Sequence, residues 1–139
     1  LLALNALERR APLTWRGAID ADAQGGLDLK LQGTAIFVDA ARILALSQGI
    51  AASGTRERFE QAGTRLGRPA AANETWASSF EFLQMLRLRV QLEPQADAAR
   101  GNPNWMSLAA LGRIDLRILR ESLKVASTLQ QRLRLDYER

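Results

Sequence analysis

The stretch from Glu81 to Leu92 constrains the fold most, because seven of its twelve residues are large and apolar. Apolar residues at this density predict a helix that other helices bury on most of its surface. Arg87, Arg89 and Gln91 interrupt the apolar residues. Because arginine is rarely buried without a partner, these side chains require a carboxylate, a domain edge or a ligand. Helical spacing places Arg87 and Gln91 on one face and Arg89 on another.

The rest of the chain predicts further helices that pack around this one. Alanine, leucine and arginine are abundant, and all three favour helices. A length of 139 residues suits one ordinary domain. We therefore predict an all-α fold: a four-helix-type bundle of about five helices within a single domain, residues 1–139. The expected helices cover residues 1–10, 35–47, 56–66, 73–92 and 112–135.

Residues 15–32 lack helical periodicity and predict a small non-helical insertion. Leu27, Leu29 and Leu31 alternate with polar residues, which is typical of a half-buried strand. Residues 15–19 could pair with this strand as a β-hairpin, provided that other elements pack against it. Upstream, Pro12 ends the first helix. We expect residues 1–12 to be the tail of a helix, and the chain to be a fragment of a longer protein.

Composition excludes several classes of chemistry. The chain has no cysteine and no histidine, which excludes disulfides, thiolate chemistry and ordinary zinc sites. It has no apolar run long enough to cross a bilayer and no signal peptide, so we expect a cytoplasmic protein without a membrane partner. The 19 basic and 15 acidic residues are interleaved. The basic residues between Arg113 and Arg134 therefore predict a solvated helix face rather than a nucleic-acid site.

No motif in the chain predicts a catalytic centre or a metal site. Asp20 and Asp22 form an Asp-x-Asp pair of the kind that holds two metals in nucleotidyl transfer. They lack a Gly-Ser loop, so we interpret them as part of an exposed turn. The glycine pairs do not match a phosphate-binding loop. Lys30 alternates with leucines, and it could reach a phosphate, pair with a carboxylate or simply face solvent.

Two interpretations of the arginines remain open from the residues alone. Arg42 interrupts the apolar face of the helix over residues 35–47, as Arg87 and Arg89 interrupt theirs. The arginines could form ion pairs, with Asp39, Glu81 or Glu121 as candidate partners. They could equally hold a ligand, since a guanidinium donates two parallel hydrogen bonds to phosphate or carboxylate.

Several stretches resemble the motifs of a known family. LDLKLQG at residues 27–33 and VDAARILAL at 38–46 are similar to its "LDLKxxG" and "VDLARxxAL" motifs. FEFL followed by LRLRVQL, at residues 80–92, resembles "FEFLxxLRLRHQL". TRERF at residues 55–59 and the chain from Leu119 to Gln130 resemble "TxxRL" and "LKEALxxxxxLQ". Two departures are Val90, where the family has histidine, and Thr14, where the "PPLG" motif has glycine.

The family with these motifs is the putative nucleotidyltransferase substrate-binding domain, and the resemblance spans nearly the whole chain. Its members are typically the C-terminal part of bacterial signal-transduction proteins with CBS and cyclic-nucleotide-binding domains. A nucleotidyltransferase domain like that of protein-PII uridylyltransferases precedes them. The resemblance implies a helical bundle that helps bind the nucleotide or the acceptor and is not catalytic alone. Magnesium and a nucleoside triphosphate are implied for the parent protein, and no cofactor for this chain.

The resemblance also implies candidate residues and partners. By motif, Lys30, Arg42, Arg87, Arg89 and Gln91 are expected at a substrate site or at the domain interface. The expected partner is the upstream nucleotidyltransferase domain, with a protein acceptor or a second copy of the chain as further candidates. The alternative is a structural or regulatory bundle for docking or dimerisation, without a ligand of its own.

Overall fold

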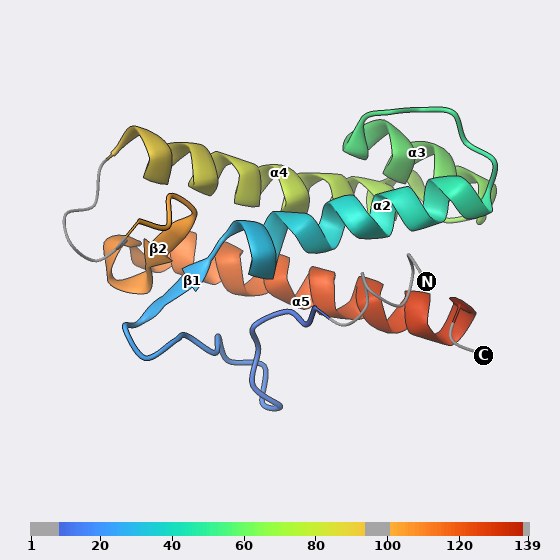
Figure 1. The fold of residues 1–139 in the computed structure, drawn as a ribbon. Coiled ribbons are helices and arrows are strands. Elements are labelled where there is room, and N and C mark those ends of the chain that lie inside the picture. Colours follow the sequence, from blue (N-terminus) through green and yellow to red (C-terminus); the bar gives the residue numbers. More distant parts are fainter. Residues whose placement is uncertain (1–8, 94–100, 138–139) are drawn as a thin grey trace.

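The computed structural model describes residues 9–93 and 101–137, and it is an all-α bundle (Figure 1). The α-helices in these residues are α2 (Ala35–Ser47), α3 (Thr55–Arg65), α4 (Ala70–Leu92) and α5 (Arg113–Tyr137). The predicted fold class is confirmed. The first predicted helix, over residues 1–10, lies almost entirely outside the described residues.

Three long helices lie side by side, and the short helix α3 covers one end (Figure 1). Helix α4 runs opposite to α2 and α5, while α3 packs against both α2 and α4. Aromatic rings fill the space beneath α3, where Phe59 meets Phe37 edge-on at 6.3 Å and Trp76 at 5.5 Å between ring centroids. Leu83 of α4 and Leu123 of α5 continue the same core.

The helix boundaries follow local signals in the sequence. Helix α2 has the predicted limits, and α3 begins one residue earlier than predicted. Helix α4 begins three residues before the predicted start at Asn73, directly after Pro69. Proline suits a helix start because its fixed φ is compatible with the first turn and its missing N–H has no intrahelical partner there.

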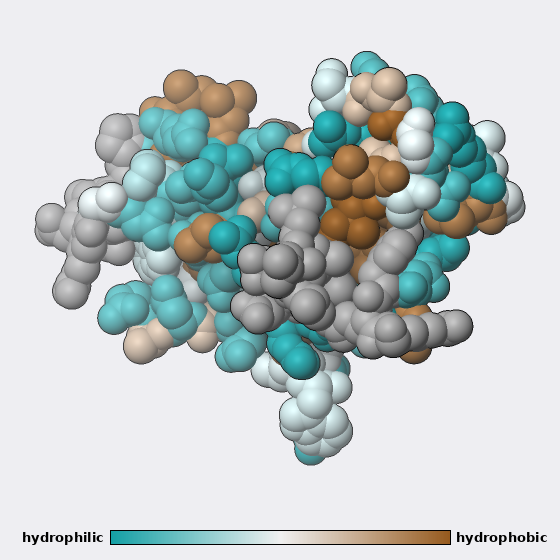
Figure 2. Space-filling model, turned by 45° about the vertical axis from the view of Figure 1, so that its right-hand side comes forward, coloured by the Kyte–Doolittle hydropathy of each residue, from teal (hydrophilic) through white to brown (hydrophobic). Residues whose placement is uncertain are grey.

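Helix α4 is less buried than its composition predicts. Leu83, Leu86 and Val90 lie in the core. Met85, Leu88 and Leu92, in contrast, are 44%, 55% and 72% exposed on the outer side of the helix. Hydrophobic residues on the face drawn in Figure 2 likewise gather in separate patches on a mostly hydrophilic surface. Within the described part of the chain, no helix is both long enough and apolar enough to cross a membrane.

A two-stranded antiparallel sheet closes the end of the bundle opposite α3 (Figure 1). Strand β1 (Gly26–Asp28) begins one residue before the predicted strand and overlaps its start, but its partner is β2 (Trp105–Ser107). The expected pairing with residues 15–19 is wrong, because that segment folds back on itself through a bridge between Leu13 and Ile19. The pairing with β2 is favoured by burial of Met106 and by the Trp105 ring lying against Gly26, where a Cβ atom would leave no room.

A π-helix, η1 (Lys30–Thr34), replaces the second half of the predicted strand and leads directly into α2. The Thr34 N–H donates to the carbonyl of Leu29 at 2.9 Å, which is the wide spacing of this helix type. Asp28 starts the turn, because its Oδ1 accepts the backbone N–H groups of Lys30 and Leu31 at 2.9 and 2.8 Å.

A small-residue contact sets the distance between α3 and α4. A Cβ atom on Gly63 of α3 would lie 1.8 Å from Oδ1 of Asn73, which is buried in α4. Only a residue without a side chain allows the two helices to approach this closely.

Candidate functional site

Arg87 lies where α4 meets η1, near the sheet end of the bundle. Its Nε and Nη2 both donate to Oδ1 of Asn104, at 3.2 and 3.1 Å. Its Nη1 donates to the hydroxyl of Thr34 at 3.3 Å and to Oε1 of Gln84 at 3.2 Å. The half-buried guanidinium therefore joins α4, the end of η1 and the loop that precedes β2.

Asn104 is itself fixed by the loop that precedes β2. Its backbone N–H donates to Oδ1 of Asn102 at 3.0 Å, and its carbonyl accepts from the Leu29 N–H at 2.8 Å. The Asn102 amide donates to Oδ2 of Asp28 at 3.0 Å. The Asn-Pro-Asn sequence thus holds η1 against α4. Sequence reasoning missed Asn104, since only the fold brings residue 104 to residue 87.

All the acceptors around Arg87 are neutral. Thr34, Gln84 and Asn104 supply amide or hydroxyl oxygens, and within residues 9–93 and 101–137 no carboxylate forms an ion pair with Arg87. Among the described residues, the positive charge is therefore held in place without a carboxylate to neutralise it. Such a group can bind an anion, because the guanidinium forms charge-assisted hydrogen bonds with phosphate or carboxylate oxygens.

Arg89 points to the opposite side of α4, as helical spacing predicts. Its Nη1 forms an ion pair with Oδ2 of Asp115 in α5 at 3.1 Å. The predicted ion pair is therefore present, but its carboxylate is not Asp39, Glu81 or Glu121, the three candidates that the sequence offered. Glu81 instead contacts Arg56, and Glu121 contacts Lys124.

The other candidates lie at two different places. Lys30 is the first residue of η1 and is exposed, and Gln91 is exposed one turn beyond Arg87. Arg42 is also exposed, but it lies about 12 Å further along α2 than Thr34 at 1.5 Å per residue. Arg42 faces solvent next to exposed Leu46, so it does not interrupt a buried face. The structure groups Lys30, Arg87 and Gln91 near one end and leaves Arg42 apart.

Asp22 is exposed and begins a turn, as predicted, and its side chain also has a structural role. Its Oδ1 accepts the backbone N–H groups of Gly26 and Gln24, both at 3.0 Å, and its Oδ2 accepts Nε1 of Trp105 at 2.7 Å. The hydrogen bond from Gly26, followed by that from Trp105, lowers the pKa of Asp22 below its ordinary value of 3.8. Among the described residues, no group of acidic side chains could hold a metal ion.

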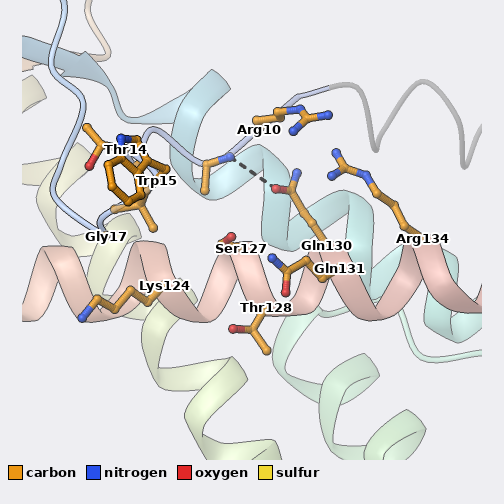
Figure 3. Close-up of a pocket in the computed structure, with 12 residues that line it drawn as sticks. Arg10, Thr14, Trp15, Gly17, Lys124, Ser127, Thr128, Gln130, Gln131 and Arg134 are labelled. Carbon is orange, nitrogen blue, oxygen red and sulfur yellow. Dashed lines mark hydrogen bonds between the residues drawn. The ribbon is translucent and has the colours of Figure 1, made fainter.

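A pocket of about 460 Å³ lies between the N-terminal segment and α5 (Figure 3). Its walls carry the side chains of Arg10, Trp15, Lys124 and Arg134, and none of the twelve described residues that line it is acidic. No pattern in the sequence indicated this pocket, because it depends on how residues 10–17 cross α5. The remaining lining residues are Ala11, Leu13, Thr14, Gly17, Ser127, Thr128, Gln130 and Gln131.

A comparison with known protein families identifies the family of the chain. The family model described as "Putative nucleotidyltransferase substrate binding domain" matches residues 1–137. The chain belongs to this family. Comparisons with curated proteins and with solved structures found no match. In this nucleotidyltransferase substrate-binding domain, the motif similar to "LRLRHQL" contains Arg87, and the motif similar to "LDLKxxG" forms the turn that Arg87 contacts.

Two surfaces of this substrate-binding domain thus combine positive charge with polar groups. One surrounds Arg87 at the sheet end of the bundle, and the other is the pocket beside α5. The first centres on Arg87, which belongs to a family motif, although Thr34 and Asn104 lie outside the motifs. The second combines residues of the stretch from Leu119 to Gln130 with residues outside the motifs.

Proposed function

We propose that this domain binds a phosphate-bearing substrate, either the nucleotide or the acceptor, for a nucleotidyltransferase domain beside it. The observation that carries the proposal is that the Arg87 guanidinium is held by three neutral oxygens. A charge that neutral oxygens position, and that no carboxylate in the described part of the chain neutralises, is available to an anionic ligand. The substrate-binding description of the family supports the same function.

The geometry around Arg87 favours ligand binding over a purely structural role. Its four hydrogen bonds measure 3.1 to 3.3 Å, longer than the 2.7–2.9 Å typical of charge-assisted bonds. A phosphate oxygen could replace any one of these neutral acceptors with a shorter bond. The adjacent π-helix supports this assignment, since π-turns occur frequently at functional sites. Lys30 and Gln91 are exposed near this end and would add a second charge and an amide.

The finer features of the proposal concern the parent protein. We expect a transferase like the protein-PII uridylyltransferases, in a bacterial signal-transduction protein with CBS and cyclic-nucleotide-binding domains. Its nucleotidyltransferase domain would bind magnesium and the nucleoside triphosphate and would carry the catalytic carboxylates. Arg89 and Arg42 would contribute to the domain interface rather than to the ligand, because Arg89 is paired with Asp115 and Arg42 lies apart.

The decisive experiment measures thermal stability with and without a nucleoside triphosphate and magnesium, in this chain joined to its nucleotidyltransferase domain. A ligand at about 100 times its Kd contributes about 2.7 kcal/mol, which raises Tm by several degrees. We expect Arg87→Ala to reduce this shift, because the contribution of Arg87 to binding is lost while the nucleotidyltransferase domain keeps its own contacts. A matched control is Arg58→Ala, because Arg58 is a half-buried arginine that also donates to a neutral oxygen, the carbonyl of Ala52 at 2.8 Å.

The variant Arg87→Gln distinguishes a loss of binding from a loss of folding, since glutamine retains donors for Asn104 but has no charge. If Arg87→Gln folds like the wild-type chain and shows a reduced ligand-induced shift, the charge contributes to binding. If both Arg87 variants keep the full shift, Arg87 does not bind the substrate and the proposal fails.

A second candidate function is docking or dimerisation without a ligand, and the exposed apolar stripe on α4 favours it. Met85, Leu88 and Leu92 are spaced at helical intervals and remain exposed. Leu88→Lys combined with Leu92→Lys should abolish self-association in sedimentation experiments if this stripe is a dimer interface. Ile114→Lys is the control, since Ile114 is an equally exposed apolar residue on α5. A chain that stays monomeric at high concentration excludes dimerisation through the stripe.

A further inference from the structure

A groove of about 480 Å³ lies beside the first half of α5, near the sheet end of the bundle (Figure 1). Arg113, Arg117 and Arg120 line it from α5. Helical spacing places these arginines on one face, within about 10 Å along the helix at 1.5 Å per residue. The other described lining residues are all apolar: Ala18, Ile19, Leu108 and Leu116. The groove therefore combines a row of cations with an apolar floor.

The charges of the three arginines are available to a partner. All three are exposed, and within residues 9–93 and 101–137 none of them forms an ion pair. The carboxylates nearest to them in α5 are engaged elsewhere. Asp115 pairs with Arg89 at 3.1 Å, and Glu121 pairs with Lys124 at 3.4 Å. The groove therefore attracts negatively charged groups.

The apolar floor of the groove is fixed by the fold. Ile19 is held by its bridge to Leu13. Leu108 begins the short 3₁₀-helix η2 (Leu108–Ala110), and its N–H donates to the carbonyl of Gly25 at 3.0 Å. Both Ile19 and Leu108 pack against the core but are only half-buried. A surface that is formed in advance binds a partner with a smaller loss of conformational entropy.

The apolar surface continues on the other side of the arginine row. Ile114 and Ile118 are 73% and 39% exposed, and helical spacing places both next to Arg117. Arg117 and Ile118 also line a second, mainly apolar groove between α5 and α4. Arginines within apolar surroundings are typical of protein–protein interfaces. The whole face is therefore larger than the groove alone.

We propose that this face of α5 docks an acidic amphipathic helix of a partner protein. Carboxylates at positions i, i+4 and i+7 of such a helix span the same length of about 10 Å as the arginine row. Apolar side chains beside them would fill the groove, in the manner of other helix-in-groove complexes. A single phosphate group is too small to contact all three arginines, and a nucleic-acid backbone has no apolar groups for Ile19, Leu108 and Leu116.

A labelled peptide provides the test by fluorescence polarisation. The probe is an alanine-based helix with glutamates at i, i+4 and i+7 and leucines beside them on the same face. We expect saturable binding to the chain. Replacing the glutamates by glutamine, or the leucines by serine, should weaken binding by about tenfold or more, because each change removes one half of the match.

Variants of the chain locate the docking face. Arg113→Gln combined with Arg117→Gln should weaken binding by about tenfold or more, since two charge contacts are lost. Both arginines are exposed, so the urea midpoint should stay the same. Arg10→Gln combined with Arg16→Gln removes the same charge from exposed positions outside the groove, and it should change affinity by less than about twofold.

Several outcomes would overturn the proposal. Absence of binding refutes it, and equal losses in the two double variants would show that only net charge attracts the peptide. Equal affinity for a peptide of the same composition with its glutamates spread around the helix would refute the match. Tighter binding of a DNA duplex would identify a nucleic-acid site instead. Arg87 does not line the groove, so Arg87→Ala should bind the peptide normally, whatever the result for the function proposed above.

Discussion

Trp105 donates a hydrogen bond of 2.7 Å from Nε1 to Oδ2 of Asp22, and so joins two segments that are 83 residues apart. The same carboxylate accepts the backbone N–H of Gly26, the first residue of β1. One side chain therefore fixes both the turn before β1 and its partner strand.

Asp22→Asn should destabilise the fold, and the loss should depend on pH. The pKa of Asp22 is lowered in the folded state, so its carboxylate contributes stability above its ordinary pKa of 3.8. That contribution disappears as pH falls through the folded-state pKa. We expect the urea midpoints of the two proteins to differ most near about pH 6 and to converge toward about pH 3. Equal midpoints at neutral pH would contradict the role of the charge.

Arg56 should make α3 and α4 sensitive to both pH and salt. Its guanidinium contacts Glu60 at 3.0 Å, Glu74 at 2.6 Å and Glu81 at 2.5 Å. Arg56 lowers the pKa of Glu74 and of Glu81 below 4.5, and the three carboxylates raise the pKa of Arg56, with Glu81 contributing most. The wild-type protein therefore gains stability above the ordinary pKa of these carboxylates and loses it at lower pH.

In Arg56→Met the three carboxylates have no cation between them and repel one another. We expect this variant to be less stable at neutral pH and to recover part of the difference as its carboxylates become protonated. The contacts are partly exposed, so added salt should also reduce the difference. Chemical denaturation across pH and ionic strength measures both effects, and an unchanged pH profile would exclude the network as their source.

Gly63→Ala should destabilise the contact between α3 and α4. The added methyl group would lie 1.8 Å from Oδ1 of Asn73, so one helix has to move. Overpacking of this kind costs about 1–3 kcal/mol, which exceeds the gain in helix propensity from alanine. Asn73→Ala in the same chain should restore much of the lost stability, because it removes the clashing atoms. If the double variant is no more stable than Gly63→Ala, the clash is not the cause.

Arg132→Met should be neutral or stabilising. The guanidinium carbon of Arg68 lies 3.4 Å from the centroid of the Trp76 ring. Nη1 of Arg68 and Nε of Arg132 are buried and have no hydrogen-bond partner among the described residues. Burial lowers the pKa of Arg68, and the charge of Arg132 lowers it further. Removing one charge relieves this repulsion, by up to about 1 kcal/mol at low salt. Urea denaturation measures the change, Arg120→Met is the exposed control, and a destabilised Arg132→Met would refute the repulsion.

The helices could be predicted from the sequence because their signals are local. Apolar spacing defined α2, and Pro69 with the alanines after it explains the earlier start of α4. Leu88 was expected to be buried but is exposed. Its exposure depends on which helices cover α4, and the apolar composition of α4 itself does not contain that information. The predicted partner of strand β1 was wrong for a similar reason. Pairing of Leu27 with Met106 depends on contacts across the fold, not on neighbouring residues.

The candidate site was predicted in part. Helical spacing correctly separated Arg87 from Arg89, and the pattern indicated that both arginines need partners. The identity of those partners, Asn104 and Asp115, required the fold, since they lie 17 and 26 residues away. The ligand role of these residues remains a prediction that the Arg87 variants test.

The π-helical turn Lys30–Thr34 has a consequence for the number of residues that this part of the domain must contain. Each of its hydrogen bonds spans five residues, so the turn holds one residue more than an α-helical turn would. Deleting one residue would rotate everything before it by about 100° relative to α2. Strand β1 would then lose its alignment with β2, and Thr34 would lose its place beside Arg87. Loops elsewhere can change in length, but this turn has to keep the same number of residues if β1 is to pair with β2 and Thr34 is to lie beside Arg87.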